Sequence, residues 1–213
     1  MSTFRFAIMG AGNIAHQFCD AVTLVEDCEV SAIASKDLGR AQKFAEECSV
    51  AHAYDNYEQM LIEEKPDCVY IAVTPNDHFR LTMLCLEHHV PVLCEKAMFT
   101  NSAEAKAVFE KAEKDQTFVM EAMWSRFLPA VNQAKKWAAE GKIGRLEALQ
   151  GRIGFLAPEG ADNRYHSPLL CGGAATDITV YAYEIATWLV NEPVRKTYAA
   201  ANLDQTGVFD ISG

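Results

Sequence analysis

The sequence predicts an α/β protein in which a doubly wound parallel sheet is followed by an α+β domain with a mainly antiparallel, open sheet. Three observations carry this prediction. A glycine-rich turn joins an apolar strand to a helix near the start of the chain. Short apolar segments then alternate with amphipathic helices, which is typical of a parallel sheet covered on both faces. The alternation stops after Glu121. We therefore expect domains at residues 1–121 and 122–213.

The glycine-rich turn begins at Gly10 and reads GAGNIA, the spacing of a Rossmann dinucleotide-binding crossover. Gly10 permits the tight turn, and Gly12 lets the backbone approach a pyrophosphate. Ala15 is small enough for the helix to lie close to the strand. The helix that starts at Asn13 and Ile14 offers free N–H groups and the positive end of its dipole to phosphate. We favour a nucleotide-binding turn over the alternative, a purely structural one.

The other elements follow from apolar periodicity. Strands are predicted at residues 4–9, 29–35, 51–54, 68–73, 90–94 and 117–121. Helices are predicted between these strands, including residues 38–48, 56–65 and 102–115. In the second domain, helices are predicted at residues 129–140 and 174–190, and strands at residues 145–155, 194–202 and near Gly207. So few elements give a thin core, and the chain ends as a strand begins, so this domain is expected to be incomplete.

The end of the second strand bears on the choice of cofactor. NAD enzymes usually place an acidic residue there to bind the ribose 2′-hydroxyl. Here Ser35 and Lys36 follow the strand, and Arg40 lies one turn further on. A hydroxyl and two cations suit a 2′-phosphate better, although Asp37 is a late acidic candidate. We therefore predict NADP, with NAD as the alternative; a solvated helix start is the structural explanation for the two cations.

Polar residues follow the fourth and fifth strands, where parallel strands face the ligand crevice. Thr74, Pro75 and Asn76 follow one strand, and Lys96 follows the other. Lys96 is a candidate for proton transfer or for holding a substrate oxygen. The alternative is a surface lysine paired with Glu95.

The helix after Gly172 carries a second candidate group. Asp177 and Tyr181 are four residues apart and share a helix face, whereas Tyr183 points elsewhere. A tyrosine can act on a carbonyl or hydroxyl oxygen when a nearby lysine stabilises its charge. The structural alternative is that Tyr181 packs against Trp188.

Taken together, these motifs resemble the family of glucose–fructose oxidoreductase, inositol dehydrogenase and related sugar dehydrogenases (Gfo/Idh/MocA). The matching segments are residues 10–15, 74–78, 94–96 and 172–181. The segment from Met120 to Pro129, and a Tyr four residues after Asp177, look most like the dihydrodiol and D-xylose dehydrogenase branch. Ala97 departs from the family pattern, which has Pro after Glu-Lys.

The resemblance implies an oxidoreductase that transfers hydride between a nicotinamide cofactor and a sugar, cyclitol or dihydrodiol, and it implies a homo-oligomer. It assigns catalysis to Lys96, Asp177 and Tyr181, with Tyr181 as the acid/base. Weaker substrate candidates are Trp124, Phe155 and Arg164. The expected cofactor contacts are Gly10, Gly12, Asn13, Ile14, Ser35, Lys36, Arg40, Thr74, Pro75, Asn76, His78, Glu95 and Lys96.

Composition excludes several other classes. The net charge of −10 argues against a nucleic-acid partner, and no apolar run is long enough to cross a membrane. The seven cysteines are scattered without a C-x-x-C pair, so we expect neither a metal site nor disulfides, and a reducing cytoplasm. A nicotinamide-binding sensor or assembly subunit without catalysis is the alternative function.

Overall fold

The computed structural model describes residues 3–158, 163–203 and 210–212. The chain divides into two compact units, Met1–Ala122 and Met123–Gly213. The boundary expected from the sequence lies one residue earlier. In the described ranges, no helix combines the length and apolar character needed to cross a bilayer.

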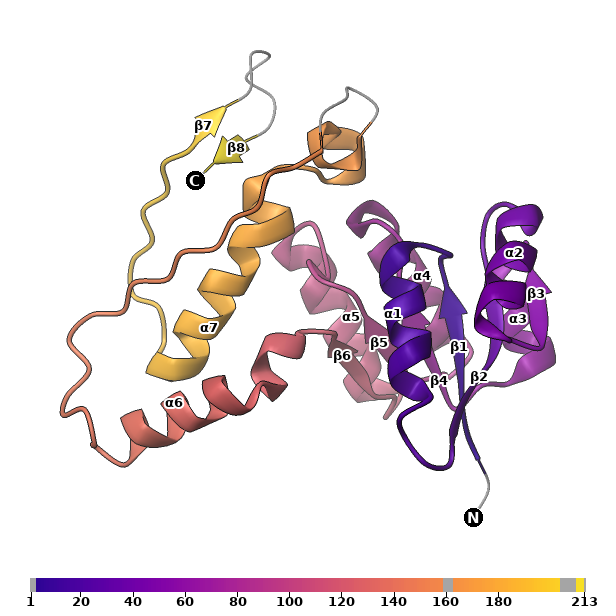
Figure 1. Cartoon of the computed structure of the whole chain (residues 1–213), viewed down its shortest axis with the longest axis horizontal. Coiled ribbons are helices and arrows are strands. Elements are labelled where there is room, and N and C mark those ends of the chain that lie inside the picture. The colour runs from indigo at the N-terminus through magenta and orange to yellow at the C-terminus, as the bar shows by residue number, and fades with distance from the viewer. Residues whose placement is uncertain (1–2, 159–162, 204–209, 213) are drawn as a thin grey trace. The chain divides into compact units, whose positions relative to one another are not determined.

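The first unit is built on a six-stranded parallel sheet (Figure 1). Its strands are β1 (Phe4–Met9), β2 (Cys28–Ala34), β3 (His52–Tyr54), β4 (Cys68–Ile71), β5 (Val92–Cys94) and β6 (Val119–Glu121). The strand order is β3-β2-β1-β4-β5-β6, so the chain reverses direction across the sheet between β1 and β4. The predicted doubly wound parallel sheet is confirmed.

Five helices connect these strands. They are α1 (Asn13–Val22), α2 (Leu38–Cys48), α3 (Tyr57–Glu64), α4 (Pro75–Glu87) and α5 (Ser102–Lys114). Three of them start at a side-chain cap, because the carboxylate of Asp37 and the amides of Asn56 and Asn101 each accept the N–H three residues on. These caps explain why α2, α3 and α5 begin close to the predicted positions.

Burial on both faces of the sheet explains why its strands are almost entirely apolar. Met9 and Ile71 face a cluster that includes residues of α3 and α4. Their neighbours Ile8 and Tyr70 face the opposite cluster, with Phe44 of α2. Successive side chains of a strand point to opposite faces, so the two clusters lie on opposite sides of one sheet.

In the residues described, most of the regular secondary structure of the second unit is helical. It contains a 3₁₀ turn η1 (Trp124–Phe127), α6 (Pro129–Ala139), short turns η2 (Arg164–His166) and η3 (Pro168–Leu170), a π-helical turn η4 (Ala175–Thr179) that leads into α7 (Val180–Val190), and the antiparallel strands β7 (Asn202–Leu203) and β8 (Asp210–Ser212). Both predicted helices of this unit are confirmed.

The strands predicted at residues 145–155 and 194–202 are wrong. Residues 145–155 form no strand, and only the last residue of the second segment enters β7. A strand exists only where a neighbouring strand completes its hydrogen bonds, and in the described part of this unit β7 and β8 supply each other's partner. Apolar side chains such as Ile153 and Phe155 stay about half exposed. Gly207 lies outside the described residues.

Candidate functional site

The turn after β1 has a backbone that only glycine can adopt. Gly10 has φ +108°, and a Cβ there would lie 2.7 Å from the carbonyl oxygen of Ala72 and 2.8 Å from Cγ1 of Val73. Both contacts come from the chain just after β4, so the turn crosses the end of β4 at close range. Ligands of open α/β sheets bind where the strand order reverses, and this turn lies at that place.

Gly12 is different, because the protein itself leaves room beside it. A Cβ at Gly12 would meet only the Ala72 carbonyl oxygen, at 3.9 Å. Gly12 caps α1, whose first residues Asn13 and Ile14 are exposed, while Ala15 is fully buried against the sheet. Open space in front of a helix N-terminus with unpaired N–H groups fits a pyrophosphate.

A second helix starts at the same end of the sheet. Thr74 caps α4, and Pro75 occupies its first position, where a missing N–H costs nothing. Thr74 is half-buried and Asn76 is exposed. The carboxyl ends of β1 and β4 therefore each lead into a helix N-terminus, which gives this edge a positive electrostatic character.

His78 of α4 links two loops of this edge. Its side chain is fully buried, and its ring contacts three backbone carbonyl oxygens: those of Ala97 at 3.0 Å, Met98 at 3.1 Å and Val73 at 3.0 Å. The ring thus lies between the loop after β5 and the end of β4 and contacts both. These contacts make His78 a support for the loop that carries Lys96. The cofactor contact expected of His78 stays a prediction.

Replacing His78 by Gln is expected to flatten the pH dependence of stability. Burial lowers the pKa of His78, against the opposing effect of the carbonyl oxygens, whereas in the unfolded chain a histidine titrates near 6.5. Below about pH 6.5 the unfolded chain therefore binds more protons at this residue than the folded chain does. As the pH is lowered through this range, the free energy of unfolding decreases by at most about 1.4 kcal/mol per pH unit for this group. Urea denaturation of both proteins between about pH 5 and 7 measures this. Parallel pH profiles would contradict the prediction.

The loop after β5 carries Glu95 and Lys96. Glu95 is buried; its carboxylate accepts the hydroxyl of Tyr70 at 2.6 Å and the backbone N–H of Lys96 at 3.2 Å. Burial raises the pKa of Glu95. Through the second of these hydrogen bonds Glu95 fixes the backbone at Lys96. The cofactor contact expected of Glu95 stays a prediction.

The predicted ribose-binding residues are spread over different surroundings. Ser35 is buried, and its hydroxyl accepts the N–H of Asp37 at 3.4 Å. Lys36 forms an ion pair with Asp77 at the start of α4. Arg40 lies on α2, and its guanidinium donates to the carbonyl oxygen of Ala11 at 3.3 Å. Arg40 is thus the predicted cation that the structure brings to the glycine-rich turn.

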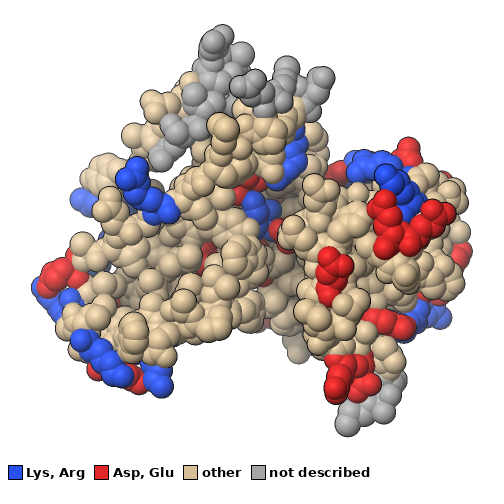
Figure 2. All heavy atoms as spheres, in the orientation of Figure 1, with Lys and Arg blue, Asp and Glu red and all other residues tan. Residues whose placement is uncertain are grey.

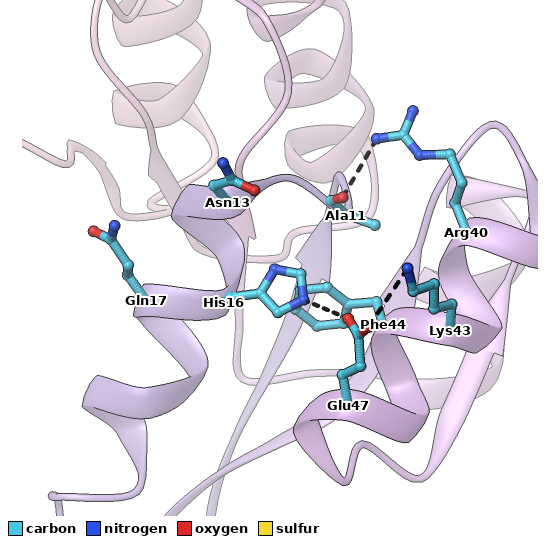
Figure 3. A pocket seen from close by; sticks show the side chains of 8 residues that line it. All are labelled: Ala11, Asn13, His16, Gln17, Arg40, Lys43, Phe44 and Glu47. Atoms are coloured by element: carbon cyan, nitrogen blue, oxygen red, sulfur yellow. Dashed lines mark hydrogen bonds and ion pairs between the residues drawn. The ribbon is translucent and has the colours of Figure 1, made fainter.

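Basic and acidic side chains lie next to one another over the part of the first unit that holds α2 and α3 (Figure 2). A pocket of about 610 Å³ opens there, between α1 and α2. It is lined by Ala11, Asn13, His16, Gln17, Arg40, Lys43, Phe44 and Glu47 (Figure 3). Asn13 and Arg40 were predicted from the sequence as site residues, whereas His16, Lys43 and Glu47 were not. Their signal was weak, because only Lys43 and Glu47 share a helix.

In the second unit, Tyr181 pairs with Trp124. Tyr181 is buried on α7, and its hydroxyl accepts a hydrogen bond of 3.0 Å from Nε1 of Trp124. The two rings meet edge to face at 5.9 Å. The indole is 56% exposed, so this pair reaches the surface of the unit through Trp124. The pair joins a predicted catalytic residue to a predicted substrate contact.

Glu184 holds the turn that carries Trp124. It is buried one helical turn after Tyr181, accepts the hydroxyl of Ser125 at 3.0 Å, and forms an ion pair with Arg126. Trp188, the other residue of this helix face, lies beneath the guanidinium of Arg126, 4.5 Å from the ring centre. The structural alternative for Tyr181 was packing against Trp188; the structure places Trp124 against the Tyr181 ring.

Asp177 lies in the π-helical turn that precedes α7. It forms an ion pair of 3.1 Å with Arg164. Gly172 makes this approach possible, since a Cβ there would lie 2.5 Å from the carbonyl oxygen of Arg164. π-Helical turns are rare and often occur at functional sites. The predicted substrate residues Phe155 and Arg164 meet at Tyr165, whose ring centre is 5.2 Å from that of Phe155 and 4.1 Å from the guanidinium carbon.

In the part of the chain that the structure describes, no group of three or more His, Cys, Asp or Glu could hold a metal. None of the seven cysteines, all within the described residues, forms a disulfide. Burial raises the pKa of the Cys19 and Cys68 thiols to about 12, so both are poor nucleophiles.

Comparison with known proteins agrees with this geometry. Residues 4–123 match the model of an oxidoreductase family with an NAD-binding Rossmann fold, and residues 131–212 match the GFO/IDH/MocA C-terminal domain. A trans-1,2-dihydrobenzene-1,2-diol dehydrogenase from Mus musculus is 32% identical over 212 residues, which are 97% of this chain and 62% of the relative. The chain thus spans about 62% of the length of such curated relatives.

Two solved structures are also similar. A probable dehydrogenase from Thermotoga maritima has a TM-score of 0.80 at 21% identity, over 95% of this chain and 60% of that one, and so shows the fold alone. A mutant of a 3-ketoreductase from Actinomadura kijaniata, in complex with TDP-benzene and NADP, has a TM-score of 0.61 at 26% identity, over 66% of this chain and 43% of that one.

Proposed function

Because the chain belongs to the GFO/IDH/MocA oxidoreductase family, we propose that it takes part in hydride transfer between a nicotinamide dinucleotide and a hydroxyl or carbonyl group of a sugar, cyclitol or dihydrodiol. The observation that carries this proposal is the turn from Gly10 to Gly12. Gly10 is required by the fold, whereas Gly12 leaves open space in front of the helix N-terminus. A turn that needed glycine only for its own geometry would not leave that space.

The residues of the first unit would hold the dinucleotide. The N–H groups of the turn and of the start of α1 would bind the pyrophosphate, and Thr74 to Asn76 border the same edge of the sheet. When bound, the nicotinamide ring supplies the hydride acceptor or donor. Lys96, at the end of β5, would supply a positive charge that stabilises an oxygen as it gains or loses a proton.

The residues of the second unit would accept and donate the proton. In the oxidation direction, the Tyr181 phenolate would take the hydroxyl proton, and in reduction the phenol would return it. The hydrogen bond from Nε1 of Trp124 is stronger to a phenolate than to a phenol, so it supports the charged form. Asp177, held by Arg164, would orient the substrate hydroxyls. The family resemblance assigns catalysis to Lys96, Asp177 and Tyr181, and the acid/base role to Tyr181.

Arg40 supports a preference for NADP over NAD, because its guanidinium lies beside the turn and a 2′-phosphate suits it. Replacing Arg40 by Ala is expected to weaken NADPH binding about 10- to 100-fold, since charge-assisted hydrogen bonds are lost, with little change for NADH. Fluorescence titration with both cofactors measures this. Lys106→Ala, which removes an exposed cation of α5, is the control. An equal loss for NADH would contradict the assignment.

The function is tested by mixing the protein with NADP and a panel of aldoses, cyclitols and trans-dihydrodiols, and following the absorbance of NADPH. Turnover of any member supports the proposed oxidoreductase. Tight NADPH binding without turnover of any substrate, in either direction, would contradict it and favour a cofactor-binding sensor or assembly subunit. The homo-oligomeric state and the cytoplasmic location expected from the sequence stay predictions.

A further inference from the structure

The pocket between α1 and α2 is lined by both basic and acidic side chains, an arrangement that was not predicted from the sequence. Arg40 and Lys43 line it from α2, and His16 lines it from α1 (Figure 3). Glu47 is the carboxylate among the lining residues. Ala11 also lines the pocket, so it adjoins the glycine-rich turn. A phosphate bound beside this turn would therefore be influenced by all four charged or titratable groups.

Glu47 contacts two of the basic groups at once. Its carboxylate lies 3.0 Å from Nε2 of His16 and 3.7 Å from Nζ of Lys43. The hydrogen bond from His16 lowers the pKa of Glu47, so this carboxylate is charged at neutral pH. Arg40 is not part of this group and instead donates to Ala11. Glu47 thus offsets the positive charge of Lys43, one of the two permanent cations of the pocket, and it also pairs with the imidazole of His16.

The dinucleotides NADPH and NADH differ only by a 2′-phosphate, which carries a charge of about −1.5 to −2 at neutral pH. A change in the charge of the pocket should therefore alter the affinity for NADPH more than the affinity for NADH. We propose that Glu47 is a specificity-determining residue, which holds Lys43 and His16 away from the 2′-phosphate and thereby reduces the preference for NADPH over NADH. This proposal rests on the dinucleotide binding proposed above.

The test is the ratio of the dissociation constants of NADH and NADPH, measured by fluorescence titration. Glu47→Gln keeps the shape of the side chain and removes its charge. We expect this variant to raise the preference for NADPH on the order of fivefold at low salt, and less at high salt. Glu46→Gln is a matched control, because Glu46 is the exposed neighbour on α2, lies outside the pocket lining, and changes the net charge equally.

A second variant tests whether Glu47 acts through the pocket cations. Lys43→Met should reduce the preference for NADPH more strongly in the Glu47→Gln background than in the native one, because Lys43 is then no longer paired. Equal effects in both backgrounds, or equal shifts for Glu47→Gln and Glu46→Gln, would overturn the proposal while dinucleotide binding stands. If the native protein bound neither cofactor, the proposed function would fall as well. Thermal melting of each variant shows that it is folded.

Discussion

A Tyr181→Phe variant is expected to lose turnover by about 10²- to 10⁴-fold, the usual contribution of a positioned acid or base. The substitution removes one oxygen, the one that accepts the hydrogen bond of Trp124. The buried ring stays in place, so its packing against Trp124 persists. NADPH affinity should change by no more than a few-fold, because the residues proposed to bind the cofactor lie in the first unit. The measurement compares the rate of NADPH formation with a fluorescence titration of NADPH.

Tyr183→Phe is the matched control for this experiment. Tyr183 lies on the same helix, but its side chain is 57% exposed, and the same atom is removed. We expect its turnover to match that of the native protein. If Tyr181→Phe kept turnover, Tyr181 would not be the acid/base. If both variants lost turnover equally, the effect would come from α7 as a whole and not from one hydroxyl.

The second large effect is expected from Gly10→Ala, which should destabilise the first unit by about 2–4 kcal/mol and prevent dinucleotide binding. The new Cβ would lie 2.7 Å from the Ala72 carbonyl oxygen, a backbone atom that cannot rotate away. The φ of +108° is also unfavourable for alanine. Chemical denaturation and NADPH titration measure the two effects separately. A variant of native stability would contradict the requirement for glycine at this position.

Gly12→Ala separates binding from folding. Its φ is −102°, which alanine tolerates, and the nearest protein atom to a new Cβ is 3.9 Å away. The free energy of unfolding should therefore change by less than about 1 kcal/mol. The methyl group would instead occupy space proposed for the pyrophosphate, so NADPH affinity should fall at least about tenfold. Unchanged affinity would mean that the open space at Gly12 is not the binding place.

Much of the first unit could be predicted because its signals are local. The strand from Phe4 to Met9 and the helix from Leu38 to Cys48 were predicted with the observed bounds, since an apolar run and a capped periodic segment mark them. The second unit was harder. The segment of residues 145–155 has the composition of a strand, but composition cannot supply the neighbour with which a strand pairs.

The same difference between local signals and contacts of distant segments explains which site residues could be predicted. Residues that follow strands, such as Thr74 and Lys96, could be proposed from the sequence because parallel topology brings strand ends to one edge. The contact between Glu184 and Ser125 joins residues 59 positions apart. The contact between His16 and Glu47 joins two helices. No periodicity within one element encodes such pairs. The sequence therefore suggested individual residues, whereas the structure shows which of them form hydrogen bonds and ion pairs with each other.

The bonds of His78 also bear on the speed and entropy of cofactor binding. Loops that order only on contact with a ligand lose conformational freedom at that moment, and this loss weakens affinity. Here the backbone at Val73 and at Ala97 already packs against one buried ring. The two segments are therefore expected to be ordered before the cofactor binds, because folding has already reduced their conformational entropy. The cofactor would then bind to a preformed surface, and the loops would not need to close around it.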